Sequence, residues 1–210
     1  VFEEIIKNIA GIQGTQNIDI KKRCVLVMCA DNGVVCEGVT QTGQEVTAVV
    51  TENFANGATS VCAMARNIGA DVVPIDVGVA RDVDGVVNKK ISYAAMMPEE
   101  MELCLERGAQ CVDASHQEGC NVISFGEMGI GNTTTSSAVA SVLLDRKAED
   151  VTGRGAGLTS GALERKIEVI KKSIELHKPD KNDIFDVLSK VGGYDIAALT
   201  GAFIGGAMYG

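Results

Sequence analysis

Residues 121–135 read NVISFGEMGIGNTTT, and this stretch carries the clearest signal for the fold. Its first part, Asn121–Phe125, is a short apolar run with the composition of a buried strand. The glycines that follow suit a tight turn, and Asn132 is suited to cap the helix that the threonines open. A buried strand, a glycine-rich turn and a helix in this order predict one unit of an α/β fold.

Two more apolar runs predict strands of the same sheet. Val25–Ala30 reads VLVMCA and Val72–Val79 reads VVPIDVGV. Neither run alternates between apolar and polar residues, which is typical of parallel strands that are covered on both faces. Helical patterns separate the three runs, so we expect an α/β domain with a mostly parallel sheet.

Apolar residues at helical spacing predict the remaining elements. The expected helices are Val1–Ile12, Gln44–Ile68 with a break near Gly57, Pro98–Ala114, Thr159–His177, Asp183–Lys190 and Tyr194–Met208. The least regular stretch, Asp82–Tyr93, is expected to be a surface loop or a small hairpin. No internal repeat and no low-complexity linker divides the chain.

Composition excludes several classes of function. The formal charge of −9 argues against a protein that binds the phosphate backbone of nucleic acid. No apolar run is long enough to span a bilayer, so no membrane role is expected. Seven cysteines without a CxxC pair, with only two histidines, predict no zinc site and a reducing, cytoplasmic compartment. We expect neither a metal nor a cofactor.

The ends of all three predicted strands carry polar or glycine-rich segments. The first runs into Asp31-Asn32-Gly33, the second holds Asp76 and Gly78, and the third runs into the segment Gly126–Thr135. Ligands of open parallel sheets bind beyond the carboxyl ends of the strands. We therefore expect the functional site at this edge.

Two glycine-rich loops are candidates for an anion site. The first, GEMGIGNTTT, precedes a helix whose N-terminus would favour a phosphate, although the pattern is neither a Walker A loop nor GxGxxG. The second, Thr152–Gly157, reads TGRGAG and also precedes a helix. Each loop has an equally acceptable structural interpretation, a capped tight turn for the first and a flexible surface loop for the second. Their occurrence together favours a shared anion pocket.

Two charged residues accompany these loops. Lys166 lies on the helix after the second loop and is either the cation of an anion site or a solvated lysine. Glu127 lies between glycines at a strand end, where a carboxylate can hold a ribose, act as a base or stabilise the loop. We expect a structural role for Asp76.

Four strings together resemble one enzyme family, in the order and spacing of that family and over nearly all of the chain. They are ADNGVVCEGVTQTGQEVTA, FGEMGIGNTT, GRGAG followed by RKIEVI, and VLSKVGGYDIAALTGA. The chain resembles the nicotinate-nucleotide–dimethylbenzimidazole phosphoribosyltransferases. The resemblance implies a three-layer α/β/α fold, a homodimer, and a single nucleotide-binding domain over residues 1–210 that is the core of a longer enzyme.

The resemblance also implies a reaction. The phosphoribosyl group of nicotinate mononucleotide passes to dimethylbenzimidazole, which gives α-ribazole phosphate and nicotinate for the lower ligand of cobalamin. A benzimidazole nitrogen attacks the anomeric carbon from the face opposite nicotinate. No pyrophosphate leaves, so no magnesium is required.

Site residues follow from the resemblance position by position. The loops would cradle the ribose phosphate, Lys166 would pair with that phosphate, and Glu127 would act near the reacting carbon. The segment Val39–Gly43, with Thr42, would line the benzimidazole pocket. The expected substrate-binding residues are Thr42, Gly129, Gly131, Asn132, Thr133, Thr134, Gly153, Gly155, Gly157 and Lys166, with Glu127 as the catalytic candidate.

The sequence also departs from the family pattern. Asn32 stands where many members have His, and Val50 stands where some members have Gln near the base. The family's KPPGSLG segment and the glutamate of its EGxGA string, the family's general base, are not among these residues. Two alternatives to the phosphoribosyltransferase therefore stay open: a relative that uses another aromatic base, and a non-catalytic domain that binds a nucleotide or base. A dinucleotide oxidoreductase is disfavoured because no GxGxxG follows the first strand.

Overall fold

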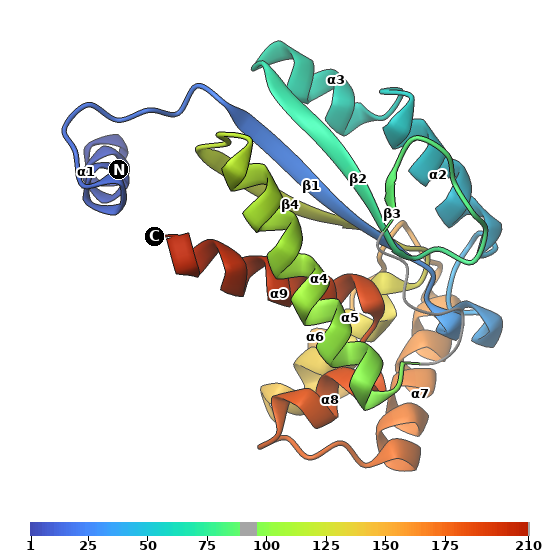
Figure 1. Cartoon of the computed structure of the whole chain (residues 1–210). Helices are drawn as coiled ribbons and strands as arrows, with labels where there is room; N and C mark the ends of the chain where they lie inside the picture. The colour runs from blue at the N-terminus through green and yellow to red at the C-terminus, as the bar shows by residue number, and fades with distance from the viewer. Residues whose placement is uncertain (89–95, 210) are drawn as a thin grey trace.

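Four parallel strands form the centre of the molecule in a computed structural model that describes residues 1–88 and 96–209 (Figure 1). They are β1 (Arg23–Ala30), β2 (Ala70–Gly78), β3 (Val87–Asn88) and β4 (Val122–Met128), in the order β3-β2-β1-β4. Both neighbours of β1 run parallel to it. The predicted parallel sheet is confirmed, with the predicted strands close to their expected bounds.

The short strand β3 lies within Asp82–Tyr93, the stretch expected to be a surface loop or a small hairpin. Val87 pairs with Ile75 of β2 in a parallel register. This pairing extends the parallel sheet and is not that of a hairpin. The last part of that stretch, residues 89–93, lies outside the described residues.

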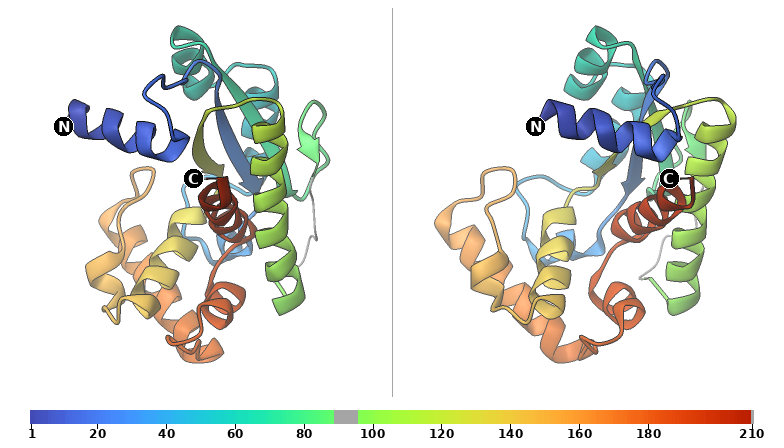
Figure 2. Two further views of the ribbon diagram at one scale, coloured as in Figure 1. Left: turned by 60° about the vertical axis from the view of Figure 1, so that its left-hand side comes forward. Right: turned by 90° about the vertical axis from the view of Figure 1, so that its left-hand side faces the viewer.

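Helices cover both faces of the sheet, which confirms the three-layer α/β/α fold (Figure 2). On one face lie α2 (Glu45–Ala55) and α3 (Ser60–Asn67), and on the other lie α4 (Pro98–Gln117) and α9 (Tyr194–Tyr209). Successive side chains of a strand point to opposite faces. In β1, Met28 therefore joins the core beneath α4 and α9, while Val27 joins the core beneath α2 and α3. Burial on both faces explains why the sequences of β1 and β2 do not alternate. The expectation of a buried strand is wrong for β4, which lies at the edge of the sheet and contains no fully buried residue.

Local capping sets the break between α2 and α3. Gly57 adopts a positive φ of 68°, a backbone conformation that favours glycine. The hydroxyl of Thr59 then accepts a hydrogen bond from the backbone N–H of Cys62 and starts α3. The break predicted near Gly57 is confirmed.

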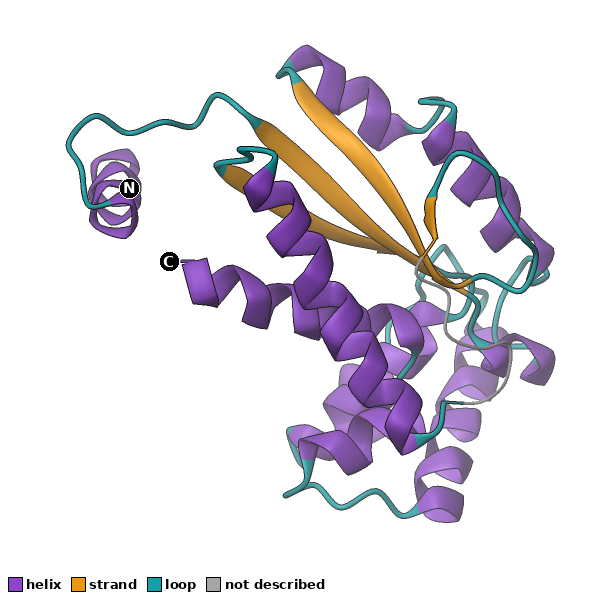
Figure 3. Cartoon of the chain, in the orientation of Figure 1, coloured by secondary structure: helices purple, strands orange, loops and turns teal. Residues whose placement is uncertain are grey.

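A cluster of four helices lies beyond the carboxyl edge of the strands (Figure 3). It consists of α5 (Asn132–Leu143), α6 (Ala148–Val151), α7 (Ser160–His177) and α8 (Ile184–Val191). Apolar side chains from all four helices form one core: Ala138, Val142, Ala148, Ile170, Val187 and Val191. One turn of helix is too short to show a periodicity, so the sequence did not predict α6.

Glycines let α4 and α9 pack closely. A Cβ atom at Gly108 would lie 1.9 Å from the carbonyl oxygen of Ala198, and one at Gly201 would lie 1.9 Å from that of Leu105. Small residues at the contact allow two helix backbones to approach, and no larger residue would fit here. This packing fixes the first turn of α9 beside the carboxyl edge of the sheet.

The first helix, α1 (Phe2–Gln13), lies apart from the sheet in Figure 1 and in the left view of Figure 2, and none of its residues is buried. Exposed apolar side chains gather on α1 and on the second half of α9: Phe2, Ile5, Ile6, Ile12, Phe203, Ile204 and Met208. None of the described helices is both long enough and apolar enough to cross a membrane.

Candidate functional site

The carboxyl edge of the sheet brings the predicted strand-end residues together. Asp31 and Asn32 follow β1, and Glu127 stands opposite Met28 near the end of β4. The strand extends to Met128, beyond the predicted end at Phe125, because its backbone continues to pair with β1. Asp76 caps the end of β2: one of its carboxylate oxygens accepts hydrogen bonds from the N–H groups of Gly78 and Val79. The expected structural role of Asp76 is confirmed.

Glu127 is held by the residue that was expected to cap α5. The side-chain amide of Asn132 donates a hydrogen bond to the Glu127 carboxyl. The N-cap position belongs instead to Gly131, with a φ of 95°, so the capping role expected for Asn132 is wrong. Partial burial raises the pKa of the Glu127 carboxyl, although the carboxyl still reaches solvent, and the hydrogen bond from Asn132 opposes that rise.

The loop between Glu127 and α5 fits only without side chains at its glycines. A Cβ atom at Gly129 would lie 2.3 Å from the carbonyl oxygen of Ala30. The loop is also fixed from α2, because the N–H of Ile130 donates to the Thr47 hydroxyl at 3.0 Å. Thr47 is fully buried, and the sequence analysis did not single it out. A threonine on the apolar face of α2 was the available signal.

Lys166 is a buried cation. Its side chain is 1% exposed, and its ammonium donates to the Thr133 hydroxyl at 2.7 Å and to the Gly153 carbonyl at 3.3 Å. Burial lowers the pKa of the ammonium. No carboxylate forms an ion pair with Lys166 in the part of the chain that the structure describes. Of the two interpretations left open, the solvated lysine is wrong.

The second glycine loop lies directly over this ammonium. A Cβ atom at Gly155 would lie 2.9 Å from the Thr133 hydroxyl and 3.6 Å from the Lys166 nitrogen. The loop residues Gly153–Gly157 are exposed, so the ammonium lies between an exposed glycine loop and the first turn of α5. The structure thus brings the two predicted loops to one place.

The segment Val39–Gly43 reaches the same place. The side-chain amide of Gln41 donates to the carbonyl of Gly157 at 2.6 Å. Its neighbour Thr42 is exposed on this surface. Gly153 is less constrained than Gly155, because a Cβ atom there would meet nothing within 4 Å.

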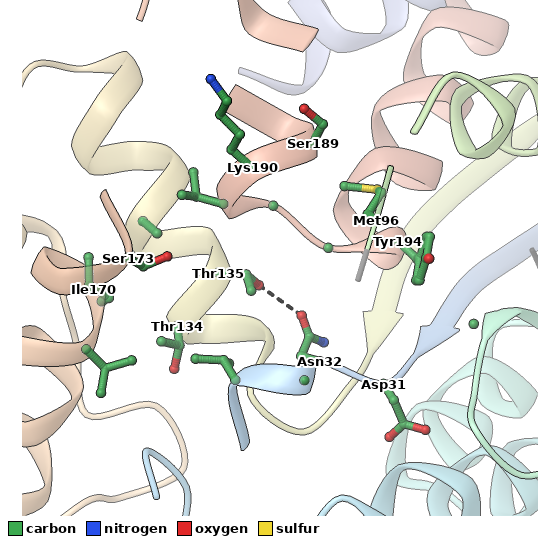
Figure 4. A pocket seen from close by; sticks show the side chains of 18 of the residues that line it. Asp31, Asn32, Met96, Thr134, Thr135, Ile170, Ser173, Ser189, Lys190 and Tyr194 are labelled. Atoms are coloured by element: carbon green, nitrogen blue, oxygen red, sulfur yellow. Dashed lines mark hydrogen bonds between the residues drawn. The ribbon is translucent and has the colours of Figure 1, made fainter. Parts of the chain in front are cut away.

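A separate cavity of about 330 Å³ lies between the carboxyl edge and the helices α5, α7 and α8 (Figure 4). Asp31, Asn32, Ile170, Ser173 and Tyr194 are among the residues that line it. Thr134 is the one predicted binding residue in its wall, and the hydroxyl of Thr134 is buried without a hydrogen-bond partner among the described residues. The other predicted binding residues lie outside this cavity.

A buried polar network borders the cavity. Asn32 donates to the Asp195 carboxylate at 3.2 Å, and its carbonyl oxygen accepts from the Thr135 hydroxyl at 3.1 Å (Figure 4). Asp195 has no exposed surface. Burial raises the pKa of Asp195 to about 6, with a further contribution from the negative charge of Glu127. The sequence analysis missed this residue, although an acid within an apolar helix was a signal for it.

Comparison with known proteins identifies relatives of this chain. A family model described as "Phosphoribosyltransferase" matches residues 1–210. Two curated relatives, from Acetivibrio thermocellus and Ruminiclostridium cellulolyticum, are each 48% identical and are named nicotinate-nucleotide–dimethylbenzimidazole phosphoribosyltransferase. The matches cover 98% and 99% of this chain and 62% of each relative.

The fold is similar to that of a solved structure. The crystal structure of CobT from Thermus thermophilus superposes with a TM-score of 0.89 at 31% identity, over 98% of this chain and 65% of that one. This chain spans about three fifths of the length of the curated relatives it matches. The family model, the named relatives and the fold lead to one assignment: the chain belongs to the nicotinate-nucleotide–dimethylbenzimidazole phosphoribosyltransferase family.

Proposed function

We propose that the chain is the nucleotide-binding core of an enzyme that transfers the phosphoribosyl group of nicotinate mononucleotide to dimethylbenzimidazole. The products are α-ribazole phosphate and nicotinate, on the route to the lower ligand of cobalamin. The observation that carries the proposal is the buried ammonium of Lys166 beneath an open glycine loop. The names of the relatives supply the substrates.

The phosphate of the nucleotide would occupy the space between the two glycine loops. Lys166 and the Thr133 hydroxyl supply a charge and a hydrogen bond there, and the N-terminus of α5 adds backbone N–H groups. Gly155 lets the loop backbone lie close to Thr133 and Lys166, because a Cβ atom there would lie 2.9 Å from the Thr133 hydroxyl. A buried ammonium without a carboxylate partner is costly to the folded protein, and a bound phosphate would offset that cost.

Glu127 is the proposed carboxylate of the reaction centre. A benzimidazole nitrogen forms a bond to the anomeric carbon, and the bond from that carbon to nicotinate breaks. The electron pair of the broken bond returns to the nicotinate nitrogen, and the second benzimidazole nitrogen loses its proton to a base. A carboxyl whose pKa is raised by partial burial is better suited to accept that proton than an ordinary glutamate. Holding the ribose is the other role open to Glu127.

The base would bind beside the segment Val39–Gly43. Thr42 is exposed. It lies next to the second loop, because the side-chain amide of Gln41 donates a hydrogen bond to the carbonyl of Gly157. We further propose that the enzyme acts in the cytoplasm as a homodimer. The exposed apolar side chains of α1 and α9 support association, and sedimentation that gave only monomers at high concentration would contradict it.

A turnover assay tests the proposal. The chain is incubated with nicotinate mononucleotide and dimethylbenzimidazole, and α-ribazole phosphate is sought by mass spectrometry with adenine as the competing base. We expect α-ribazole phosphate from the wild type and much less from Lys166→Met. Tight binding of the nucleotide without any product would favour the non-catalytic alternative, and a product with adenine alone would favour a different base.

A further inference from the structure

Asp195 is a buried acid at the first turn of α9, at the point where that helix meets the sheet. Its two carboxylate oxygens accept hydrogen bonds from the side-chain amide of Asn32 at 3.2 Å and from the N–H of Ile196 at 2.9 Å. No cation forms an ion pair with it among residues 1–88 and 96–209. A buried carboxylate without a cation is unfavourable for stability, so stability alone does not account for an acid here.

Contacts lead from this carboxylate to the proposed reaction centre. Asn32 accepts a hydrogen bond from the hydroxyl of Thr135, which also lies 2.9 Å from the carbonyl oxygen of Asn132. The side-chain amide of Asn132 in turn donates to Glu127. A buried side chain at the start of α9 is thus linked through three polar residues to a carboxyl at the end of β4.

The backbone around the pair is packed closely enough to keep it in place. A Cβ atom at Gly129 would lie 2.9 Å from the Asp195 carboxylate, and one at Gly193 would lie 2.6 Å from its other oxygen and 2.7 Å from the Asn32 side chain. Glycines on two separate segments therefore enclose the pair of side chains. Little freedom is left for either side chain to turn away.

We infer that Asp195 is a positioning residue: by holding Asn32, and through it Thr135, it fixes the first turn of α5, from which Asn132 holds Glu127. The role that this gives Asp195 in the reaction rests on the proposed function of Glu127. The placement of Asn132 and Glu127 does not rest on that proposed function, and it can be measured without nucleotide. The titratable groups that face Asp195 are Glu127 from β4, Cys29 from β1 and Cys104 from α4.

Nuclear magnetic resonance of the whole chain tests this inference through two signals. The side-chain amide of Asn132 reports its hydrogen bond, and the carboxyl carbon of Glu127 reports its titration. In Asp195→Ala, the Asn132 side-chain amide signal is expected to move to the position of an amide without this hydrogen bond. In Asp195→Asn, it is expected to stay at the wild-type position. An amide at position 195 can still pair with Asn32 if the Asn32 side chain turns over, so the conservative variant keeps the contact and loses only the charge.

Thr135→Val serves as a second variant, because it breaks the link between Asn32 and α5 without emptying a buried charged site. Loss of the Asn132 hydrogen bond should raise the midpoint of the Glu127 titration, since that hydrogen bond favours the ionised carboxyl. The control is Val187→Ala, which truncates a fully buried side chain of α8 away from these contacts. It should lower stability and leave both signals unchanged.

Unchanged Asn132 and Glu127 signals in Asp195→Ala and Thr135→Val would overturn the inference. Equal changes in Val187→Ala would also overturn it, because they would mean that any loss of stability changes the Asn132 and Glu127 signals. Nucleotide binding is measured separately on the same variants. A chain that gives the expected signals and binds no nicotinate mononucleotide would contradict the proposed function and leave the positioning role intact.

Discussion

The ammonium of Lys166 lies 2.7 Å from the hydroxyl of Thr133, and the two groups come from different helices of the cluster beyond the sheet. Gly155 of the second loop lies beside this contact, and Lys166 is buried, so the charge is shielded from water. A charge-assisted hydrogen bond to phosphate in such a place is stronger than the same bond at a protein surface.

Replacing Lys166 by methionine tests the anion site. Charge-assisted hydrogen bonds contribute roughly 1.5–3 kcal/mol, so the affinity for nicotinate mononucleotide should fall about 10- to 100-fold in isothermal titration calorimetry. Lys171→Met is the matched control, because Lys171 lies on the same helix and pairs with Glu149 at the surface. An equal loss of affinity in both variants would mean that the general charge of α7 matters, and the buried ammonium does not.

One of the three glycines of the second loop gives a second test. Gly155→Ala should weaken nucleotide binding, because its Cβ would lie 2.9 Å from the Thr133 hydroxyl and its φ of 55° is strained for alanine. Gly161→Ala, in the first turn of α7, is the control and should bind like the wild type, because a Cβ there meets nothing within 4 Å. Equal binding by the two variants would contradict the close approach of the loop to Thr133.

Asp195 should make stability depend on pH. Its pKa in the folded chain is raised to about 6 from an ordinary value of 3.8, so the folded state holds the proton more tightly than the unfolded state does. Wild-type stability should therefore fall as the pH rises from about 4 to 6, by roughly 3 kcal/mol if this group alone is counted. Asp195→Asn lacks this titration.

Urea unfolding of both proteins at pH 4 and pH 7 measures the effect. The stability of Asp195→Asn relative to the wild type should increase between the two pH values. A constant difference between the two proteins would show that the Asp195 carboxyl titrates alike in the folded and unfolded chains.

Glu127→Gln should lower the pKa of Asp195. Burial is the larger cause of the raised pKa and the negative charge of Glu127 contributes to it, so the pKa should fall below 6 and stay above its ordinary value. The carboxyl signal of Asp195 is followed by nuclear magnetic resonance, with the exposed Glu118→Gln as the control. No change in Glu127→Gln would mean that the two carboxyls do not sense each other.

Most of the fold could be predicted from local patterns. The apolar runs of β1 and β2 are buried on both faces, and α3, α7 and α8 begin at a capping side chain, from Thr59, Thr159 and Asp183. Two kinds of element could not be predicted. A two-residue strand and a one-turn helix, β3 and α6, are too short to show a period.

Only those parts of the candidate site that lie in local sequence patterns could be predicted. The glycine loops and Lys166 are adjacent to recognisable local patterns, so their place beyond the sheet followed from topology. Asp195 is 163 positions from Asn32, and no local pattern indicates that they share a hydrogen bond. Thr47 likewise holds Ile130 from 83 positions away. Contacts between distant segments depend on how the layers pack, which sequence periodicity does not describe.

Binding of nicotinate mononucleotide compared with nicotinate riboside tests the account most directly, because the two ligands differ only in the phosphate. Calorimetry on the wild type should show at least about tenfold tighter binding of the mononucleotide, and Lys166→Met should abolish that preference. Equal affinity of the wild type for both ligands, or an unchanged preference in Lys166→Met, would contradict a phosphate site at Lys166 and Thr133.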